Sequence, residues 1–280
     1  MIRISEMTAE DVTFARSLTD IEQWGHLEED FQRFLEVNPD GCFVAWERSE
    51  RLGIVTSVVH GDYAFLGNLI VAKEARARGI GLVLMKRVID ILDRKGVKTI
   101  ELDGVFRAVE VYRMLGFRDK YLSLRFMRPA SKGACIKGEL TICRTPNISS
   151  ILRFDRERLG MDRSNFLEHL IGTHPDATPS VIGRQGMSGY GVVRFRATGT
   201  FHIGPLVAGD TESASALLSS ICAEHGKSDL TIGVPCTNTS AIGIVLKHGF
   251  CHRPPSLRMY RGAIRFYEDR VYGIISADVG

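Results

Sequence analysis

The chain has 280 residues, of which 44% are hydrophobic and 25% charged, and its formal net charge is +3 at pH 7. This length suffices for two domains of ordinary size, and the composition is normal for a globular protein. The net charge is small, and the basic residues are spread along the chain rather than clustered. Both observations argue against nucleic-acid and acidic-membrane partners. No window approaches 18 uncharged apolar residues, so the sequence predicts no membrane span.

The six cysteines include no C-x-x-C pair, and in a chain of this size they are interpreted as buried thiols in a reducing compartment. The first residues lack a basic region followed by an apolar stretch, so no secretory signal is expected. We therefore expect a cytoplasmic protein. The histidines and cysteines show no metal-ligand spacing, so no metal is expected. The sequence also has no G-x-S-x-G motif, which a serine hydrolase would need.

The first sixty residues are predicted to form a strand, two helices and a hairpin. Thr8 and Asp11 form a start resembling a capping box for the first helix, and Asn38-Pro-Asp-Gly41 ends the second. The expected elements are a strand at 2–6, helices at 8–19 and 27–37, and strands at 42–47 and 52–59.

The next stretch contains an apolar strand, a short charged turn with two glycines, and a long amphipathic helix. Residues 66–71 form the apolar run, and Gly79 and Gly81 lie in the turn. The helix is predicted from apolar residues at spacings of three, four, seven and eight, which place them on one face. That face comprises Ile80, Val83, Leu84, Val88, Ile91 and Leu92.

The arrangement Arg76-x-x-Gly79-x-Gly81 between this strand and helix is suited to binding a diphosphate. The first turn of a helix has backbone N–H groups without partners, and its dipole favours anions. An ordinary turn with two glycines would give the same pattern. A nucleoside-triphosphate loop is excluded because no Lys-Ser or Lys-Thr follows the glycines, and the three-glycine dinucleotide motif fails at Leu84.

A second motif follows at a characteristic distance. Residues 98–103 are predicted to form a strand, and residues 108–117 a short helix that contains Tyr112 and ends at Gly116-Phe117. With Arg76, Gly79 and Gly81, the sequence Tyr-x-x-x-Gly-Phe resembles the signature of the GNAT superfamily of acetyl-CoA-dependent N-acetyltransferases. The resemblance extends over about residues 1–128.

The resemblance implies a mixed α/β (α+β) fold in which a central mixed sheet is flanked by helices, and it implies acetyl-CoA as acyl donor. Three strand residues would lie along the pantetheine and acetyl group, with a strand N–H directed at the thioester oxygen: Leu69, Ile70 and Val71. The loop from Ala77 to Leu82 would donate N–H groups to the diphosphate, with added charge from Arg76 and Arg78 unless these are solvated surface arginines. The cofactor-binding loop is thus Arg76, Ala77, Arg78, Gly79, Ile80, Gly81 and Leu82.

By the same resemblance, Tyr112 is predicted to be the catalytic acid that protonates the coenzyme A thiolate. A core aromatic residue would show the same spacing on a short helix. The general base stays open, since a water chain could also serve. The candidates are His26, Glu28, Glu29, Asp30 and Asp103, each of which could instead be an exposed or capping group.

The second half of the chain is predicted to be a repeat of the first. Residues 131–137 are interpreted as a linker between a catalytic domain at 1–130 and a GNAT-like domain at 138–280. Alignment of the two Gly-Phe pairs matches Val245 to Tyr112, and Gly209-Asp210-Thr211-Glu212-Ser213-Ala214 replaces the glycine loop. Carboxylates there would repel a phosphate, so the second copy is predicted to be degenerate and without acetyl-CoA.

These features together predict an N-acetyltransferase with tandem GNAT-like domains, acting by direct attack of a primary amine of a small molecule on the thioester. The alternative is a non-catalytic module that binds acyl-CoA as a sensor, or a scaffold. No nucleic-acid or membrane partner is expected, and the chain is expected to act as a monomeric pseudo-dimer or a homodimer. The identity of the acceptor amine stays open.

Overall fold

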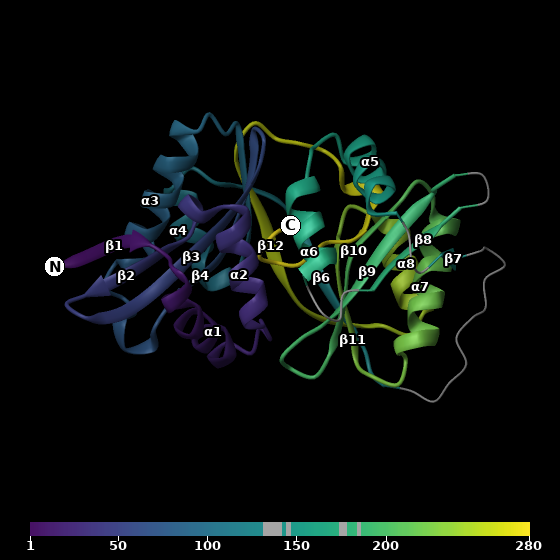
Figure 1. Cartoon of the computed structure of the whole chain (residues 1–280), viewed down its shortest axis with the longest axis horizontal. Coiled ribbons are helices and arrows are strands. Elements are labelled where there is room, and N and C mark those ends of the chain that lie inside the picture. The colour runs from purple at the N-terminus through teal and green to yellow at the C-terminus, as the bar shows by residue number, and fades with distance from the viewer. Residues whose placement is uncertain (131–141, 144–146, 174–177, 184–185) are drawn as a thin grey trace. The chain divides into compact units, whose positions relative to one another are not determined.

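The computed structural model describes residues 1–130, 142–143, 147–173, 178–183 and 186–280 (Figure 1). Contacts divide the chain into two compact units that exchange segments. Unit 1 contains residues 1–119, 259–264 and 278–280, and unit 2 contains residues 120–258 and 265–277. No helix in the described ranges is long and apolar enough to cross a membrane.

This division differs from the domain limits predicted at residues 130 and 138. Residues 120–128 group with unit 2, whereas residues 259–264 and 278–280 group with unit 1. The sequence could not reveal this exchange, because any strand with an apolar face can pair with more than one neighbour. The predicted linker, residues 131–137, lies outside the described residues.

Unit 1 has the strand order β1-β2-β3-β4-β5, followed by the end of β12 beside β5. Neighbouring strands from β1 to β4 are antiparallel, and β4 and β5 are parallel. Its elements are β1 (Ile2–Glu6), α1 (Val12–Ile21), α2 (Glu28–Val37), β2 (Phe43–Glu47), β3 (Glu50–His60), β4 (Tyr63–Val71), α3 (Ile80–Arg94), β5 (Thr99–Gly104) and α4 (Val109–Met114).

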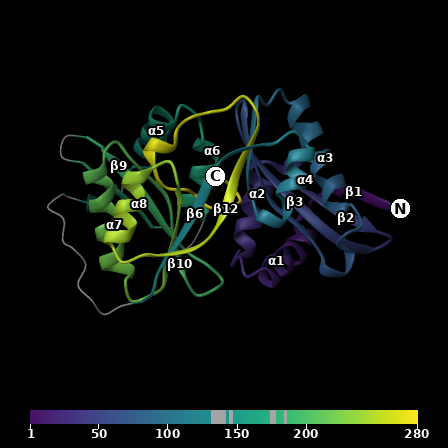
Figure 2. The same cartoon turned by 180° about the vertical axis from the view of Figure 1, so that it is seen from behind.

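Helices cover both faces of the unit 1 strands. α1 and α2 pack on each other and on β3, whereas α3 contacts β2, β3 and β4 from the other face (Figures 1 and 2). The predicted capping box is confirmed: the Thr8 backbone N–H donates to Asp11 Oδ2 at 2.9 Å, at the short 3₁₀ turn that leads into α1.

The apolar face of α3 is rotated from the predicted one. Ile80, Leu84, Val88 and Leu92 are buried as expected, but Val83 is 43% exposed and Ile91 is only half-buried. Met85 and Ile89 are buried in their place. The row at every fourth residue faces the strands. Packing against the strands decides which neighbouring row is buried as well, and the sequence periodicity alone does not determine this.

Unit 2 has the strand order β6-β11-β10-β9-β8-β7, and β13 pairs with β10. The β10 and β11 strands run parallel, as β4 and β5 do in unit 1. The elements are β6 (Arg118–Arg128), β7 (Ile142–Cys143), α5 (Ile148–Leu159), α6 (Ser164–Thr173), β8 (Thr178–Ile182), β9 (Gly189–Phe195), β10 (Phe201–Ala208), α7 (Thr211–His225), β11 (Leu230–Pro235), α8 (Thr239–Lys247), β12 (Cys251–Gly262) and β13 (Val271–Gly273).

Helices also cover both faces of the unit 2 strands. Tyr190 on β9 contacts Phe154 and Asp155 of α5, whereas Val193, three residues further, belongs to the core formed with α7 and α8. Side chains an odd number of residues apart on a strand point to opposite faces. The α5 helix and the α7–α8 pair therefore lie on opposite sides of β9.

Two strands carry the exchange between the halves of the chain. The sequence predicts that residues 117–127 close the first sheet, but residues 123–128 of β6 pair with β11 in unit 2. The end of β12 takes the place beside β5 in unit 1, where the backbone N–H of Ala263 donates to the carbonyl oxygen of Lys98 at 2.9 Å. Each unit thus uses a strand from the other half of the chain.

Candidate active site

The loop between β4 and α3 contains two residues with left-handed backbone and leads directly into the helix. Ala77 and Gly79 have positive φ values of 62° and 77°, and Gly79 is the N-cap of α3. Among the described residues no side chain caps this helix, and its first intrahelical bond joins Val83 N–H to the Gly79 carbonyl at 3.1 Å. The earlier N–H groups of the first turn therefore remain available to an anion.

The backbone conformation explains one of the two loop glycines but not the other. Gly79 needs its left-handed backbone, which a Cβ would strain. A Cβ at Gly81 would lie 3.7 Å from Val71 Cγ2 and 4.0 Å from Leu69 Cδ2, which is ordinary contact. The fold itself does not require a glycine at 81. Its missing Cβ leaves open the space between the start of α3 and the end of β4.

Both arginines of the loop are bonded to carboxylates. Arg76 donates to Glu22 Oε1 at 2.6 Å and to the Val71 carbonyl at 3.0 Å, and Arg78 donates to Glu47 at 2.7 Å. Burial raises the pKa of Glu22, but the hydrogen bonds from Arg107 and Arg76 outweigh this and lower the pKa below its ordinary value. These pairs tie the loop to α1 and β2. The predicted role of the two guanidinium groups at the diphosphate stays a prediction.

The end of β4 separates from β5. The parallel register between them runs from Tyr63 to Leu66 and goes no further, so Leu69, Ile70 and Val71 have no register partners on β5. The parallel pairing of β4 with β5 ends next to Asn68, a buried non-glycine residue with a φ of 49°. Ile70 is buried in the core, whereas Leu69 and Val71 are partly exposed beside Gly81. An opened parallel pair leaves strand N–H groups free to bind a ligand.

Tyr112 lies on α4 with its ring against the end of β5. The helix ends at Gly116, whose φ is 86°, and the Phe117 N–H donates to the Tyr112 carbonyl at 3.1 Å. Burial raises the pKa of Tyr112 to about 12, although Arg107 lowers it somewhat. The phenol is therefore protonated at neutral pH, and no described residue bonds its hydroxyl.

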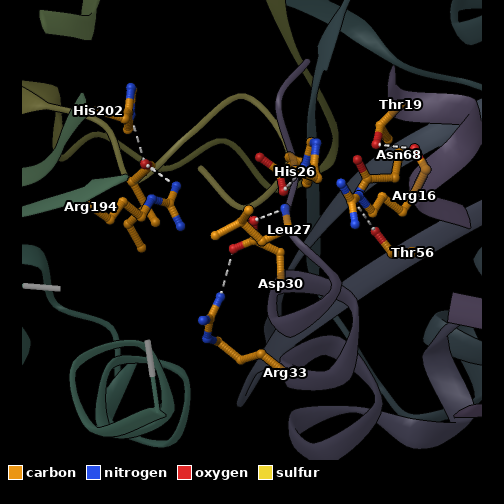
Figure 3. A network of polar contacts seen from close by, with 12 residues as sticks. Arg16, Thr19, His26, Leu27, Asp30, Arg33, Thr56, Asn68, Arg194 and His202 are labelled. Atoms are coloured by element: carbon orange, nitrogen blue, oxygen red, sulfur yellow. Dashed lines mark hydrogen bonds and ion pairs between the residues drawn. The ribbon is translucent and has the colours of Figure 1, made fainter. Parts of the chain in front are cut away.

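The candidate bases have different surroundings. Asp30 accepts hydrogen bonds from the Leu27 backbone N–H at 2.9 Å and from Arg33 at 3.0 Å, so it caps α2 (Figure 3). Glu28 is half-buried and accepts from Thr13, Glu29 is exposed, and Asp103 is half-buried. His26 is only 2% exposed, and its Nε2 lies 3.0 Å from Asp278 Oδ2.

The matching positions in unit 2 have different chemistry. Asp210 is the N-cap of α7, and its carboxylate accepts from the Ser213 backbone N–H at 2.7 Å. The position aligned with Tyr112 is Val245, which is buried. Between β10 and β11 lies β13: it pairs with β10, and the Ile274 N–H donates to the Gly233 carbonyl of β11 at 2.9 Å. The opening of the second parallel pair is thus filled by the chain itself.

Sequence reasoning missed two groups near the first opening. A Cβ on Gly67 of β4 would lie 2.2 Å from the carbonyl oxygen of Asp278, so this distant residue packs directly on β4. Asn68 donates through Nδ2 to Thr56 at 3.1 Å, and its Oδ1 is buried without a partner among described residues. No local pattern marks Asp278, because a contact between residues 211 positions apart leaves no periodic signal. Asn68 gave only a weak signal, as a polar residue inside an apolar strand.

With the glycine turn, the opened strand pair and the buried tyrosine in place, comparison with known families gives the class. The description "Acetyltransferase (GNAT) family" matches residues 10–117, and "Acetyltransferase (GNAT) domain" matches residues 151–273. The chain belongs to the GNAT acetyltransferases and contains two GNAT domains in tandem. It is an acetyltransferase, and acetyl-CoA is the acyl donor of this family.

Individual relatives align with most of the chain. The chain is 26% identical to a holothin acyltransferase of Pseudoalteromonas sp. (strain SANK 73390), over 86% of this chain and 81% of the relative. It is 25% identical to an uncharacterized N-acetyltransferase, YitH, of Bacillus subtilis (strain 168), over 79% and 78%. Both alignments extend through most of the two units.

Solved structures show the same fold. A provisionally assigned acetyltransferase from Pyrococcus horikoshii superposes with a TM-score of 0.85 at 25% identity, covering 100% of this chain and 96% of that one. A tandem GNAT protein from the clavulanic acid biosynthesis pathway superposes with a TM-score of 0.67 at 12% identity, covering 95% and 100%. At that identity, the second likeness concerns the fold alone.

Proposed function

We propose that this chain transfers the acetyl group of acetyl-CoA to a primary amine of a small molecule, and that unit 1 carries the reaction. The observation that supports this most is the contrast between two helix starts. The N-terminus of α3 has glycine at its cap and no capping side chain, whereas Asp210 caps that of α7. An anionic ligand fits the first and is repelled by the second.

In this proposal the N–H groups from Ala77 to Leu82 bind the diphosphate, and Gly81 lets it approach the backbone. Leu69 and Val71 line the path of the pantetheine, and a strand N–H of the unpaired end of β4 polarises the thioester carbonyl. Acetyl-CoA supplies an activated acetyl group, so the protein needs no covalent intermediate of its own. Its tasks are to orient both reactants and to move protons.

Tyr112 is proposed as the acid that returns a proton to the departing thiolate. Its raised pKa keeps the phenol protonated, and its hydroxyl is not engaged by another described residue. The ring is held in place by Gly104 and by an edge contact with Phe117 at 6.2 Å between centroids. A held, protonated phenol is suited to donating one proton at a fixed position.

We further propose that the second GNAT domain, placed at residues 138–280 from the sequence, is degenerate and binds no acetyl-CoA. Its counterpart of Tyr112 is Val245, and β13 fills the opening between β10 and β11. This domain would substitute for the partner subunit of a dimer, giving a monomeric pseudo-dimer in the cytoplasm. Light scattering of the purified chain measures its mass directly, and a dimer would contradict this part.

The test of the proposed activity combines binding and turnover. Calorimetry with acetyl-CoA should show binding to the purified chain. Thiol release is then measured with a panel of small primary amines, which includes holothin because a relative is named for acylating it. Transfer to at least one small amine supports the proposal. Binding without transfer to any member, combined with transfer to protein amino groups, would overturn the small-molecule assignment.

A further inference from the structure

Four residues of unit 1 that are distant in sequence meet at β4, immediately before the proposed acetyl-binding segment. His26 follows α1, Thr56 lies on β3, Asn68 lies on β4, and Asp278 follows β13. All of them are buried, with His26 2% and Asn68 3% exposed. Figure 3 shows His26 and the Asn68–Thr56 pair in the same close view, as two separate groups of polar contacts.

The His26–Asp278 contact determines which ring nitrogen can act as a base. The Nε2 atom lies 3.0 Å from Asp278 Oδ2, so an ionised carboxylate requires Nε2 to carry the proton and donate it. The other nitrogen, Nδ1, then carries a lone pair. Nδ1 is buried and has no hydrogen-bond partner in the described part of the chain. A carboxylate that orients one nitrogen and leaves the other free is the arrangement that prepares an imidazole for proton abstraction.

The ring is also held by its neighbours. Its centroid lies 5.5 Å from that of Phe31 and 6.3 Å from that of Trp24. Asp278 is held against the strand, because its carbonyl oxygen occupies the place that a Cβ at Gly67 would need. The pair is therefore a rigid group that adjoins β4 two residues before Leu69.

A second unpartnered acceptor belongs to Asn68, the residue of β4 that follows Gly67, on which Asp278 packs. Asn68 uses Nδ2 to donate to Thr56, and its Oδ1 is buried with no donor among described residues. Two buried acceptors without donors are costly unless a ligand provides the donors. A primary ammonium group provides three donors and no acceptor, so it can supply the donors that His26 Nδ1 and Asn68 Oδ1 lack.

We propose that His26 Nδ1 and Asn68 Oδ1 bind the nitrogen of the acceptor amine, that His26 is its general base, and that Asp278 is the positioning residue for His26. This rests on the proposed function above. The ammonium transfers one proton to Nδ1, which gives an imidazolium stabilised by Asp278, and the freed lone pair attacks the thioester carbonyl. The C–S bond breaks, Tyr112 protonates the sulfur, and the new amide nitrogen, which still holds a second proton, passes that proton to the Tyr112 phenolate. His26 then releases its proton to water, so the net products are the amide, coenzyme A and one proton.

Two near-isosteric variants and one control test this assignment. His26→Gln places an amide N–H where Nε2–H was and removes the base at Nδ1, and Asp278→Asn removes the carboxylate. His60→Gln, at another buried histidine of unit 1 on β3, is the control. With the fastest amine of the panel, we expect kcat to fall at least about 100-fold in the first two. Acetyl-CoA affinity should be unchanged in all three, and kcat should be unchanged in the control.

A spectroscopic measurement keeps this proposal separate from the activity itself. Two-bond ¹H–¹⁵N NMR of the full chain reports which nitrogen of His26 carries the proton, and adding butylamine to the coenzyme A complex should shift the Nδ1 resonance. A proton on Nδ1 in the wild-type chain, or an Nδ1 resonance that butylamine leaves unmoved, would overturn the proposal even if transfer is observed. Unchanged kcat in folded His26→Gln would do the same. If no amine is acetylated yet Nε2–H and the shift are seen, the proposed function fails and the amine site stands.

Discussion

The ring of Tyr112 packs on the backbone of Gly104 so closely that a Cβ there would lie 2.9 Å from Cε2. Gly104 ends β5 and Tyr112 lies one turn into the helix that follows, so the strand end determines where the phenol is held. This contact connects the sheet to the proposed acid. It also makes the position of the hydroxyl testable without touching the tyrosine.

Replacing Tyr112 by Phe should reduce kcat about 100-fold or more and leave acetyl-CoA affinity unchanged, because only the proton donor is lost. A thiol-release assay measures kcat, and calorimetry measures acetyl-CoA affinity. Gly104→Ala should reduce kcat as well, by displacing the ring. Gly243→Ala, where a Cβ meets nothing within 4 Å, is the matched control. Equal turnover in Tyr112→Phe and the wild type would reject the role of the phenol.

The two loop glycines should respond in opposite ways. Gly81→Ala should stabilise α3 by roughly 0.5–1 kcal/mol, since its Cβ meets only ordinary contacts, and should still weaken acetyl-CoA binding. Gly79→Ala should cost about 1–2 kcal/mol of stability because its φ is 77°. Thermal unfolding and calorimetry separate these effects. Undiminished affinity in Gly81→Ala would show that no diphosphate approaches this turn.

Glu22 should contribute stability that depends on pH. Its folded pKa lies below the ordinary value of 4.5, because the bonds to Arg107 and Arg76 outweigh burial. The unfolded state therefore binds more protons in acid, and the contribution is present above pH 4.5 and is lost as pH falls through the folded pKa. The stability difference between the wild type and Glu22→Gln should shrink in that window. A difference that is constant from pH 7 to pH 3 would contradict the ion pairs.

His248 should make unit 2 sensitive to mild acid. It accepts from Ser219 Oγ at Nε2, 2.8 Å away, and burial lowers its pKa below 6.5, assisted by Lys247 and Arg128 and opposed by the bond to the Ile244 carbonyl. The unfolded state binds the proton first, so stability is lost as pH falls from 6.5 through the folded pKa. Denaturant titrations at several pH values should show a smaller loss in His248→Gln. An equal loss in both proteins would mean that other groups are responsible.

The second unit should take no acetyl-CoA, so calorimetry of the whole chain should give one site. Asp210→Ala removes the carboxylate at α7 and should cost about 1 kcal/mol of stability through the lost cap. The site count should stay at one, because β13 still fills the opening between β10 and β11. Two sites per chain in the wild type would contradict the assignment of unit 2.

Much of the fold could be predicted from local patterns. Apolar periodicity and turn residues gave β4, α3, β5 and α4 to within about three residues, because these signals depend on neighbours in the chain. The Thr8–Asp11 cap followed from the same kind of reasoning, and so did the loop with Gly79 and Gly81. The buried row of α3 was only partly right: Val83, on the predicted face, is exposed, and Met85, outside it, is buried, because packing against the strands decides which row is covered.

The sequence by itself determined the family, and it predicts the position of the acetyl-CoA motif, since residue types at short, fixed spacings carry both signals. The tertiary structure alone decided that β6 and the end of β12 change units, that β13 enters the opening of the second parallel pair, and that Asp278 reaches His26. Those relationships join residues separated by tens to hundreds of positions. They depend on which surfaces bury each other on folding, and no periodic pattern along one strand or helix encodes that choice.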